Sequence, residues 1–178
     1  MELSPGLAMV ACRPGSAMHL GHVAWGYSDP RGAQTEMTAG SVEDSRGLPY
    51  APPDVMEFWQ ESVPVSETDR LAQRLILLGY EEFKAWTVGD PKPDAAAEVA
   101  LAQSRKSYFV CGNNCLDTVH RILTAYGASA QHLHSPRHPS SWIPNAWYRS
   151  IPVESLPLSS LSRVAGSLRR RDAQRIGG

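Results

Sequence analysis

Residues 18–40 contain two short stretches of strand character joined by a turn, and this feature constrains the fold more than any other. The first stretch, residues 18–27, has the aromatic and β-branched content of a strand and is entered through Gly21. Residues 28–32, Ser-Asp-Pro-Arg-Gly, have the composition of a turn. Residues 33–40 then alternate apolar and polar side chains, as a returning strand does. The pattern predicts an antiparallel hairpin.

Further strands and helices surround this hairpin, and together they predict an α+β fold. A first strand, or the segment leading into it, is expected within residues 1–15, and residues 41–54 have the composition of a loop. Residues 56–65 can form a third strand, in which Pro64 indicates a sheet edge or a strand end. The later elements expected are a helix capped by Ser66, with Leu71, Leu75, Ile76 and Leu78 on its buried face and Gly79 at its end, a strand at 83–88, a helix from about Asp94, and a helix from about Asn114 to Tyr126 that Gly127 ends.

Length and composition indicate one globular domain. The chain has 178 residues, of which 42% are hydrophobic and 20% are charged. We expect a single domain over residues 1–158. Residues 159–178 contain few large apolar groups and three successive arginines, so we expect them to form a loosely ordered C-terminal tail.

The charge balance excludes several classes of partner. A net charge of −1 gives no general attraction to nucleic acid or to anionic membranes. No apolar run reaches the ~18 residues of a membrane span, so no stable membrane anchor is expected. Residues 1–15 lack the basic start and the long apolar run of a signal peptide. We expect a cytoplasmic protein, or one secreted by a signal-peptide-independent route, and the sequence leaves its oligomeric state open.

Cys115 is the first candidate for a reactive group, because it stands at the expected start of a helix. There the helix dipole and the unpaired N–H groups favour an anion, which lowers the pKa of a thiol, and the same groups can hold an oxyanion. Asn113 and Asn114 suit the N-cap and are candidates for a further oxyanion donor. The alternative is that Cys115 is an ordinary buried thiol, the usual state of a free cysteine.

Cys111 and a group of histidines offer competing interpretations. As a nucleophile, Cys111 would lack the dipole, since it lies outside the expected helix. A disulfide to Cys115 is disfavoured in a reducing compartment, and a zinc site would need a second Cys or His pair. His132, His134 and His138 could bind zinc or copper, but no acidic or cysteine partner is near them in sequence. We expect no metal and no cofactor.

His22 is the candidate general base. It lies in the first strand of the hairpin, where the small residues Ala24 and Gly26 share its face and leave room for a helix that carries the nucleophile. His19 competes with it from the other face of the strand. The alternative for either residue is a hydrogen-bonded structural histidine.

Gln34 and Glu36 are candidates for the residue that orients His22. They share one face of the returning strand, and either could accept from the second ring nitrogen of His22 as the third member of a triad. The alternative is that both are ordinary polar residues on the surface of an edge strand.

The order of these features resembles that of the circularly permuted papain-like superfamily, which includes permuted NlpC-type peptidases, lecithin–retinol acyltransferase-like proteins and PPPDE peptidases. In those proteins the His strand precedes the Cys helix, the reverse of the order in papain. Residues 21–27, Gly-His-Val-Ala-Trp-Gly-Tyr, are similar to the His strand, and residues 108–127 to the Tyr…Asn-Cys helix. Residues 36–40, Glu-Met-Thr-Ala-Gly, are similar to the Glu-x3-Gly that follows the PPPDE histidine. The resemblance covers roughly residues 15–150.

This resemblance implies a papain-like α+β fold in permuted order, in which a small antiparallel sheet packs against the helix that bears the nucleophile. By this comparison Cys115 is the nucleophile, His22 the general base, and Glu36 or Gln34 the orienting residue. The function implied is that of a cysteine peptidase or amidase, a thiol hydrolase that cleaves peptide or isopeptide bonds in a peptide or protein substrate. A cell-wall peptidase or a bacterial effector would fit this description. The extra Cys111 departs from the family pattern.

Two alternative functions remain. An acyltransferase would use the same Cys-His pair with an amine or lipid acceptor, although the chain lacks the membrane helix and basic region of that branch of the family. A non-catalytic interaction module would bury Cys115 and dock a partner through the aromatic residues of 142–148.

Overall fold

The computed structural model describes residues 5–16, 20–32, 34–43, 50–52, 56–109, 113–136 and 143–167, and over these residues the fold is α+β, as expected. In chain order the elements are β1 (Gly6–Arg13), β2 (His22–Asp29), β3 (Glu36–Glu43), β4 (Tyr50–Ala51), β5 (Glu57–Pro64), η1 (Val65–Glu67), α2 (Thr68–Leu77), β6 (Glu82–Val88), α3 (Pro93–Ser104), β7 (Tyr108–Phe109), α4 (Cys115–Tyr126), α5 (Pro144–Ser150), β8 (Leu156–Pro157) and η2 (Leu158–Ser160). Residues 161–167 are helical as well.

Within the described ranges, six strands form one antiparallel sheet in the order β5-β3-β2-β1-β6-β8. The predicted hairpin is confirmed by β2 and β3, which pair with Asp29 opposite Glu36. β5 lies at one edge of the sheet and ends at Pro64. This agrees with the prediction, because Pro64 has no N–H group to donate to a further strand. β4 and β7 pair with each other in a separate small sheet.

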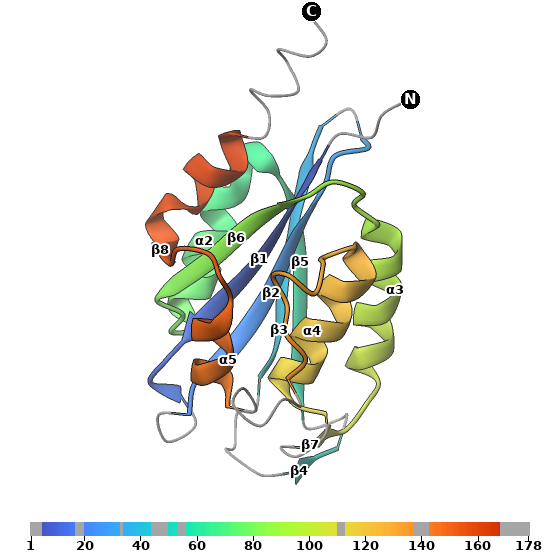
Figure 1. Cartoon of the computed structure of the whole chain (residues 1–178), viewed down its shortest axis with the longest axis vertical. Coiled ribbons are helices and arrows are strands. Elements are labelled where there is room, and N and C mark those ends of the chain that lie inside the picture. The colour runs from blue at the N-terminus through green and yellow to red at the C-terminus, as the bar shows by residue number, and fades with distance from the viewer. Residues whose placement is uncertain are drawn as a thin grey trace, which may run out of the picture.

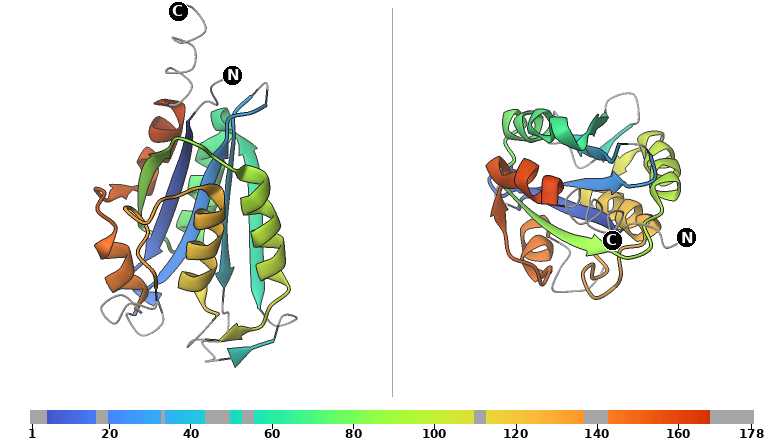
Figure 2. Two further views of the ribbon diagram at one scale, coloured as in Figure 1. Left: turned by 45° about the vertical axis from the view of Figure 1, so that its right-hand side comes forward. Right: turned by 90° about the horizontal axis from the view of Figure 1, so that it is seen from above.

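Helices cover both faces of the large sheet, so that two apolar cores form (Figures 1 and 2). α3, α4 and α5 lie on one face, where Val23 and Trp25 of β2 point. α2 and residues 158–167 cover the other face, toward which Ala24 points. Successive side chains of a strand point to opposite faces, so both cores draw on the same strands. α4 is thereby held against the middle of the sheet.

α4 has well-defined ends, and its predicted extent is confirmed. The Asn114 side chain caps the helix by accepting from the N–H of Asp117 at 3.1 Å, and the Asp117 carboxylate accepts from the Asn114 N–H in return. Gly127 ends the helix with φ at 106°, a left-handed conformation that favours glycine. The apolar residues of its buried face include Leu116, Val119, Leu123 and Tyr126.

The start of α2 differs from the prediction, and that of α3 agrees with it to within one residue. Ser66 lies in a 3₁₀ turn, and α2 begins after it, at Thr68, so Ser66 is not the N-cap. The buried residues of α2 recur at helical spacing, and they are Thr68, Leu71, Ala72 and Leu75. Ile76 lies beside this face and is 50% exposed, although it was expected to be buried. α3 begins at Pro93, next to the expected start at about Asp94, and Asp94 lies inside its first turn.

The packed part of the chain extends beyond residue 158, where the domain was expected to end. Leu161 and Ala165 are buried against the α2 side of the sheet, so residues 159–167 are not a loosely ordered tail. The rest of the expected tail, residues 168–178, lies outside the described residues.

Candidate active site

Ionisable side chains from four elements meet at one end of the sheet, the lower end in Figure 1. Arg13 is the last residue of β1, His22 the first of β2, Glu43 the last of β3 and Cys115 the first of α4. The β1–β2 pairing places Arg13 opposite His22, and the antiparallel β2–β3 pairing carries the end of β3 to the start of β2. The fold therefore brings together residues that are far apart in the chain.

Cys115 is a free thiol that is 3% exposed. Its sulfur interacts with the His22 ring and with the backbone N–H of Val23. The cap made by Asn114 leaves the N–H groups of Cys115 and Leu116 without an acceptor inside the helix. Burial by itself would raise the pKa of the thiol, but the charge on His22, the bond to that ring and the Val23 N–H lower the pKa of Cys115 below its ordinary 9.0.

His22 is 5% exposed, and its ring interacts with both the Cys115 thiol and the Glu43 carboxylate. Its Nε2 lies 3.6 Å from Glu43 Oε2 and makes no hydrogen bond in the part of the chain that the structure describes. Burial would lower the pKa of His22, and Arg13 opposes the charge as well. The thiolate, the bond to it and the Glu43 charge outweigh both and raise the pKa of His22 above 6.5. The pair therefore favours thiolate and imidazolium.

Glu43 is 7% exposed and is held by three donors. Its Oε2 accepts from Arg13 Nη2 at 3.0 Å, while its Oε1 accepts from the Tyr80 hydroxyl at 2.9 Å and from the Ser41 hydroxyl. Burial would raise the pKa of Glu43, but the charge on His22 and these three donors lower it below its ordinary 4.5. A buried carboxylate is thus kept ionised beside the imidazole.

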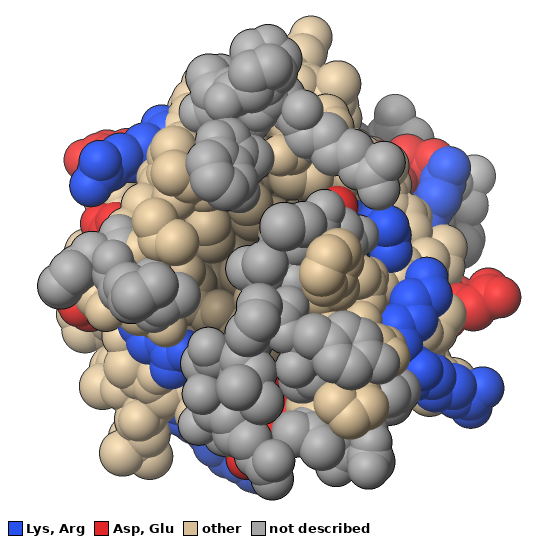
Figure 3. Space-filling view, turned by 90° about the horizontal axis from the view of Figure 1, so that it is seen from below, with Lys and Arg blue, Asp and Glu red and all other residues tan. Residues whose placement is uncertain are grey.

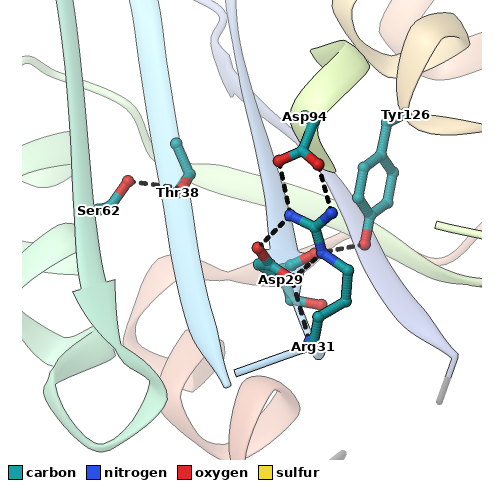
Figure 4. Close-up of polar contacts among 7 residues, drawn as sticks. Asp29, Arg31, Thr38, Ser62, Asp94 and Tyr126 are labelled. Atoms are coloured by element: carbon teal, nitrogen blue, oxygen red, sulfur yellow. Dashed lines mark hydrogen bonds and ion pairs between the residues drawn. The ribbon is translucent and has the colours of Figure 1, made fainter. Parts of the chain in front are cut away.

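The predicted contact of Gln34 or Glu36 with His22 is wrong. Glu36 stands opposite Asp29, at the far end of the hairpin, and both Gln34 and Glu36 are exposed. The reason is that β3 continues to Glu43 instead of ending near residue 40, so the carboxylate beside His22 comes from the other end of the strand. Figure 4 shows the polar contacts of the far end.

The prediction that Ala24 and Gly26 leave room for the helix of Cys115 is also wrong. Ala24 points toward α2, and a side chain at Gly26 would meet Met9 and Met37 on that same face, whereas α4 packs on the opposite face. The small residues therefore do not make room for the Cys helix. Because His22 is the first residue of its strand, its ring lies at the end of the sheet and can contact Cys115 from there.

Asn113 and Asn114 build the N-terminus of α4. Asn114 is the cap, and the Asn113 side chain donates to the carbonyl of Ser107 at 2.7 Å and accepts from Arg121 at 3.1 Å. These contacts fix the backbone that leads into Cys115. A role for either side chain as an oxyanion donor stays a prediction.

Several competing candidates lie outside the described residues, namely Cys111, His19 and His138. His132 stacks on Trp86, with 5.4 Å between the ring centres and 9° between the planes. Over the described ranges, no group of three His, Cys, Asp or Glu side chains could hold a metal ion.

The sequence reasoning missed Glu43, Arg13 and Tyr80. Residues 41–43, Ser-Val-Glu, alternate polar and apolar side chains in the opposite phase to residues 36–39, and with the β-branched Val42 this local signal could have extended the returning strand to Glu43. Arg13 and Tyr80 carry no local signal, because their role depends on the pairing of β1 with β2 and on the turn that follows α2.

No family model, no curated protein and no solved structure matches the chain. A search of the described helices for one long and apolar enough to cross a bilayer found none. Figure 3 shows the molecule from below, from the end where the four elements meet, and the described Lys, Arg, Asp and Glu residues lie mainly toward the periphery with both signs represented. The described part of this surface therefore favours no single sign of charge in a substrate.

Proposed function

We propose that the chain is a thiol hydrolase that cleaves an amide bond, in a peptide or an isopeptide linkage, through an acyl-enzyme. The observation that carries this proposal is the meeting of Cys115, His22 and Glu43 at one end of the sheet, where His22 Nε2 lies 3.6 Å from Glu43 Oε2 and the Cys115 thiol interacts with the same ring. The second described thiol gives the contrast: burial raises the pKa of Cys12 to about 12, as expected for an ordinary core cysteine. A lowered thiol pKa next to a raised histidine pKa is what nucleophilic catalysis needs.

In the proposed reaction the Cys115 thiolate attacks the carbonyl carbon, and a carbon–sulfur bond forms. The oxyanion lies at the N-terminus of α4, where the N–H groups of Cys115 and Leu116 can donate to it. The tetrahedral intermediate collapses as His22 gives its proton to the leaving nitrogen, and the carbon–nitrogen bond breaks. Water, deprotonated by His22, then attacks the thioester, which releases a carboxylic acid and restores the thiolate. Glu43 holds the ring and balances its charge throughout.

The fold that we propose for this chemistry is papain-like in permuted order. Three features support it: the histidine strand precedes the cysteine helix in the chain, the cysteine is the first residue of a helix packed on the sheet, and an acidic residue from the next strand contacts the histidine. Functional analogy from a fold alone is weak, so the proposal depends on the site.

The test is to trap the acyl-enzyme with a small ester, p-nitrophenyl acetate, and to locate the acetyl group by mass spectrometry of tryptic peptides. We expect acetylation at Cys115 that is lost in Cys115→Ala, and release of acetate by water. Cys12→Ala is the matched control, because it removes a buried thiol that is not bonded to His22, and it should acetylate like the wild type.

Two results would redirect the proposal. If a primary amine such as glycine amide accelerates turnover and carries off the acetyl group, the chain is an acyltransferase that uses the same pair. If Cys115 neither acetylates nor reacts with iodoacetamide faster than Cys12 in the folded protein, the hydrolase proposal fails and a non-catalytic module is favoured. A panel of peptide and isopeptide substrates then defines the scissile bond.

A further inference from the structure

Arg13 connects three separate segments at the candidate site. It ends β1, and its guanidinium donates through Nη1 to the carbonyl of Leu78 at 2.6 Å and through Nη2 to Glu43 at 3.0 Å. The guanidinium carbon also lies 5.5 Å from the centre of the Tyr80 ring. These contacts join the end of β1 to the end of β3 and to the turn that follows α2.

The two oxygens of Glu43 have different partners, and this division gives Arg13 a specific place. Oε1 is occupied by the hydroxyls of Ser41 and Tyr80. Oε2 is the atom that lies 3.6 Å from His22 Nε2, and it is the same atom that accepts from Arg13. Arg13 therefore holds the oxygen that faces the imidazole.

We propose that Arg13 is a positioning residue of the hydrolase, which acts through Glu43 by keeping that carboxylate ionised and its Oε2 directed at His22. This inference rests on the proposed function, because it assigns Arg13 to the same site. Arg13 is not a catalytic residue in this proposal, since among the described residues its guanidinium bonds to Glu43 and to the Leu78 carbonyl and lies over the Tyr80 ring, and none of these is a reacting group.

The electrostatics of the site make the role of Arg13 measurable. A buried carboxylate tends to protonate unless cations or donors compensate the lost hydration. The groups that face Glu43 are Arg13 from β1, His22 from β2, and Tyr80 and Ser41, while Cys115 from α4 faces it across the imidazole. Arg13 has two effects of opposite sign on His22: its own charge disfavours the imidazolium, and by keeping Glu43 ionised it favours the imidazolium.

These opposite effects predict a characteristic pH dependence for Arg13→Gln. Without the guanidinium, Glu43 protonates at a higher pH, the imidazolium loses its neighbouring anion, and the thiolate of Cys115 is less populated. We expect alkylation of Cys115 by iodoacetamide to be at least about fivefold slower than in the wild type near pH 5. Near pH 7.5 Glu43 is ionised again and the repulsion on His22 is gone, so the rates should agree within about twofold.

A double-variant experiment tests whether Arg13 acts through Glu43. Rates are measured near pH 5 for Arg13→Gln, Glu43→Gln and the double variant, with folding checked by circular dichroism. If Arg13 acts through Glu43, the double variant should react no more slowly than Glu43→Gln alone, because nothing remains for Arg13 to position and its direct repulsion of the imidazolium is also gone. Arg31→Gln is the matched control, an arginine between carboxylates at the far end of the hairpin, and should react like the wild type.

Three results would overturn the proposal: equal slowing at both pH values, multiplication of the two single effects in the double variant, or slowing by Arg13→Lys as large as that by Glu43→Gln. Arg13→Lys keeps the charge but not the planar fork that holds Glu43 and the Leu78 carbonyl, so it should slow alkylation near pH 5 less than Arg13→Gln or Glu43→Gln does, and it decides the matter if Arg13→Gln does not fold. Because alkylation needs only the thiolate, this experiment distinguishes failure of the Arg13 proposal from failure of the hydrolase proposal, which acetyl transfer to water tests.

Discussion

The two ends of the β2–β3 hairpin each hold an arginine beside carboxylates, but in different surroundings. At the site end, the side chains of Arg13 and Glu43 are 25% and 9% exposed and lie next to His22. At the far end, Arg31 bonds to Asp29 and Asp94, and the side chains of Arg31 and Asp94 are 39% and 83% exposed (Figure 4). The same pair of residue types therefore occurs once with a buried carboxylate and once with an exposed carboxylate.

The comparison shows that the chemical effect of an ion pair depends on the groups that the pair contacts. Hydrogen bonds from Arg31 lower the pKa of Asp29 and of Asp94, just as the site end lowers the pKa of Glu43. The carboxylates at the far end face solvent, which screens them, whereas Glu43 faces an imidazole that also interacts with a thiol. Charge at the site end is thus coupled to a nucleophile, and charge at the far end is not.

The largest expected effect is that of removing the imidazole at the site end. His22→Ala should reduce turnover of any substrate at least about 10³-fold, because the general acid and base is lost. The pKa of Cys115 is lowered chiefly by the charge on His22, so in this variant it should rise, and the pH profile of iodoacetamide alkylation should move to higher pH. Alkylation in the wild type should persist below pH 9.0.

The matched control for this variant is His120→Ala, which removes a half-buried histidine from the middle of α4. Both its turnover and its alkylation profile should match those of the wild type. Equal alkylation profiles for His22→Ala and the wild type would show that the imidazole does not set the thiol pKa.

The next effect compares two glutamates at opposite ends of β3. Glu43→Gln should lower turnover about 10- to 10²-fold, since the ring loses its negative neighbour but keeps a polar group of similar size. Glu36→Gln, which changes an exposed residue, should change turnover by less than about twofold. If the two variants lose activity equally, the assignment of Glu43 to the site is wrong.

The same variant has a defined dependence of stability on pH. The pKa of Glu43 is lowered below 4.5, so its contribution to stability is complete above pH 4.5 and is lost as the pH falls through the folded-state value. The pKa of His22 is raised above 6.5, so its contribution is complete below pH 6.5 and is lost as the pH rises through the folded-state value. The difference in Tm between the wild type and Glu43→Gln should therefore be widest from pH 4.5 to 6.5.

Much of the fold could be predicted because its signals are local. A turn sequence between two stretches of strand character predicted the hairpin, and the cap Asn114, the apolar face and Gly127 predicted α4. Cys115 and His22 were identified in the same way, from the start of a helix and from a strand. Their contact was expected from the order of the motifs, which a family resemblance supplied, rather than from any local pattern.

The rest depends on long-range pairing that no short segment encodes. The third polar residue was sought near the turn, at Gln34 and Glu36, because the returning strand was expected to end at residue 40. β3 continues for three further residues, and Glu43 at its end is the carboxylate beside His22. This could not be predicted from one segment, because the pairing register is a property of both strands together. The role of Arg13 could not be predicted either, because its contact with Glu43 requires β1 to lie next to β2.

A smaller effect tests how far the site end depends on its backbone. Gly21 precedes His22 with φ at 91°, and a Cβ there would lie 2.0 Å from Asn145 Oδ1. Gly21→Ala should therefore destabilise the protein by about 1–3 kcal/mol in chemical denaturation and slow the alkylation of Cys115. Gly15→Ala, in the same connection but with nothing within 4 Å of its Cβ, should be close to neutral. Equal losses in the two variants would contradict this account.

The smallest effect belongs to the far end of the hairpin. Arg31→Gln removes the ion pairs to Asp29 and Asp94, but water can solvate all three groups, so the Tm should change by no more than about 2 °C. Adding salt should shrink even this difference, because the wild-type pairs are screened while the glutamine variant has none to screen. Thermal unfolding at low and high salt, run in parallel with Glu43→Gln, measures both ends on one scale. A fall in Tm as large as that of Glu43→Gln would mean that exposure does not separate the two ends, and that the burial of Glu43 is not what makes it costly to change.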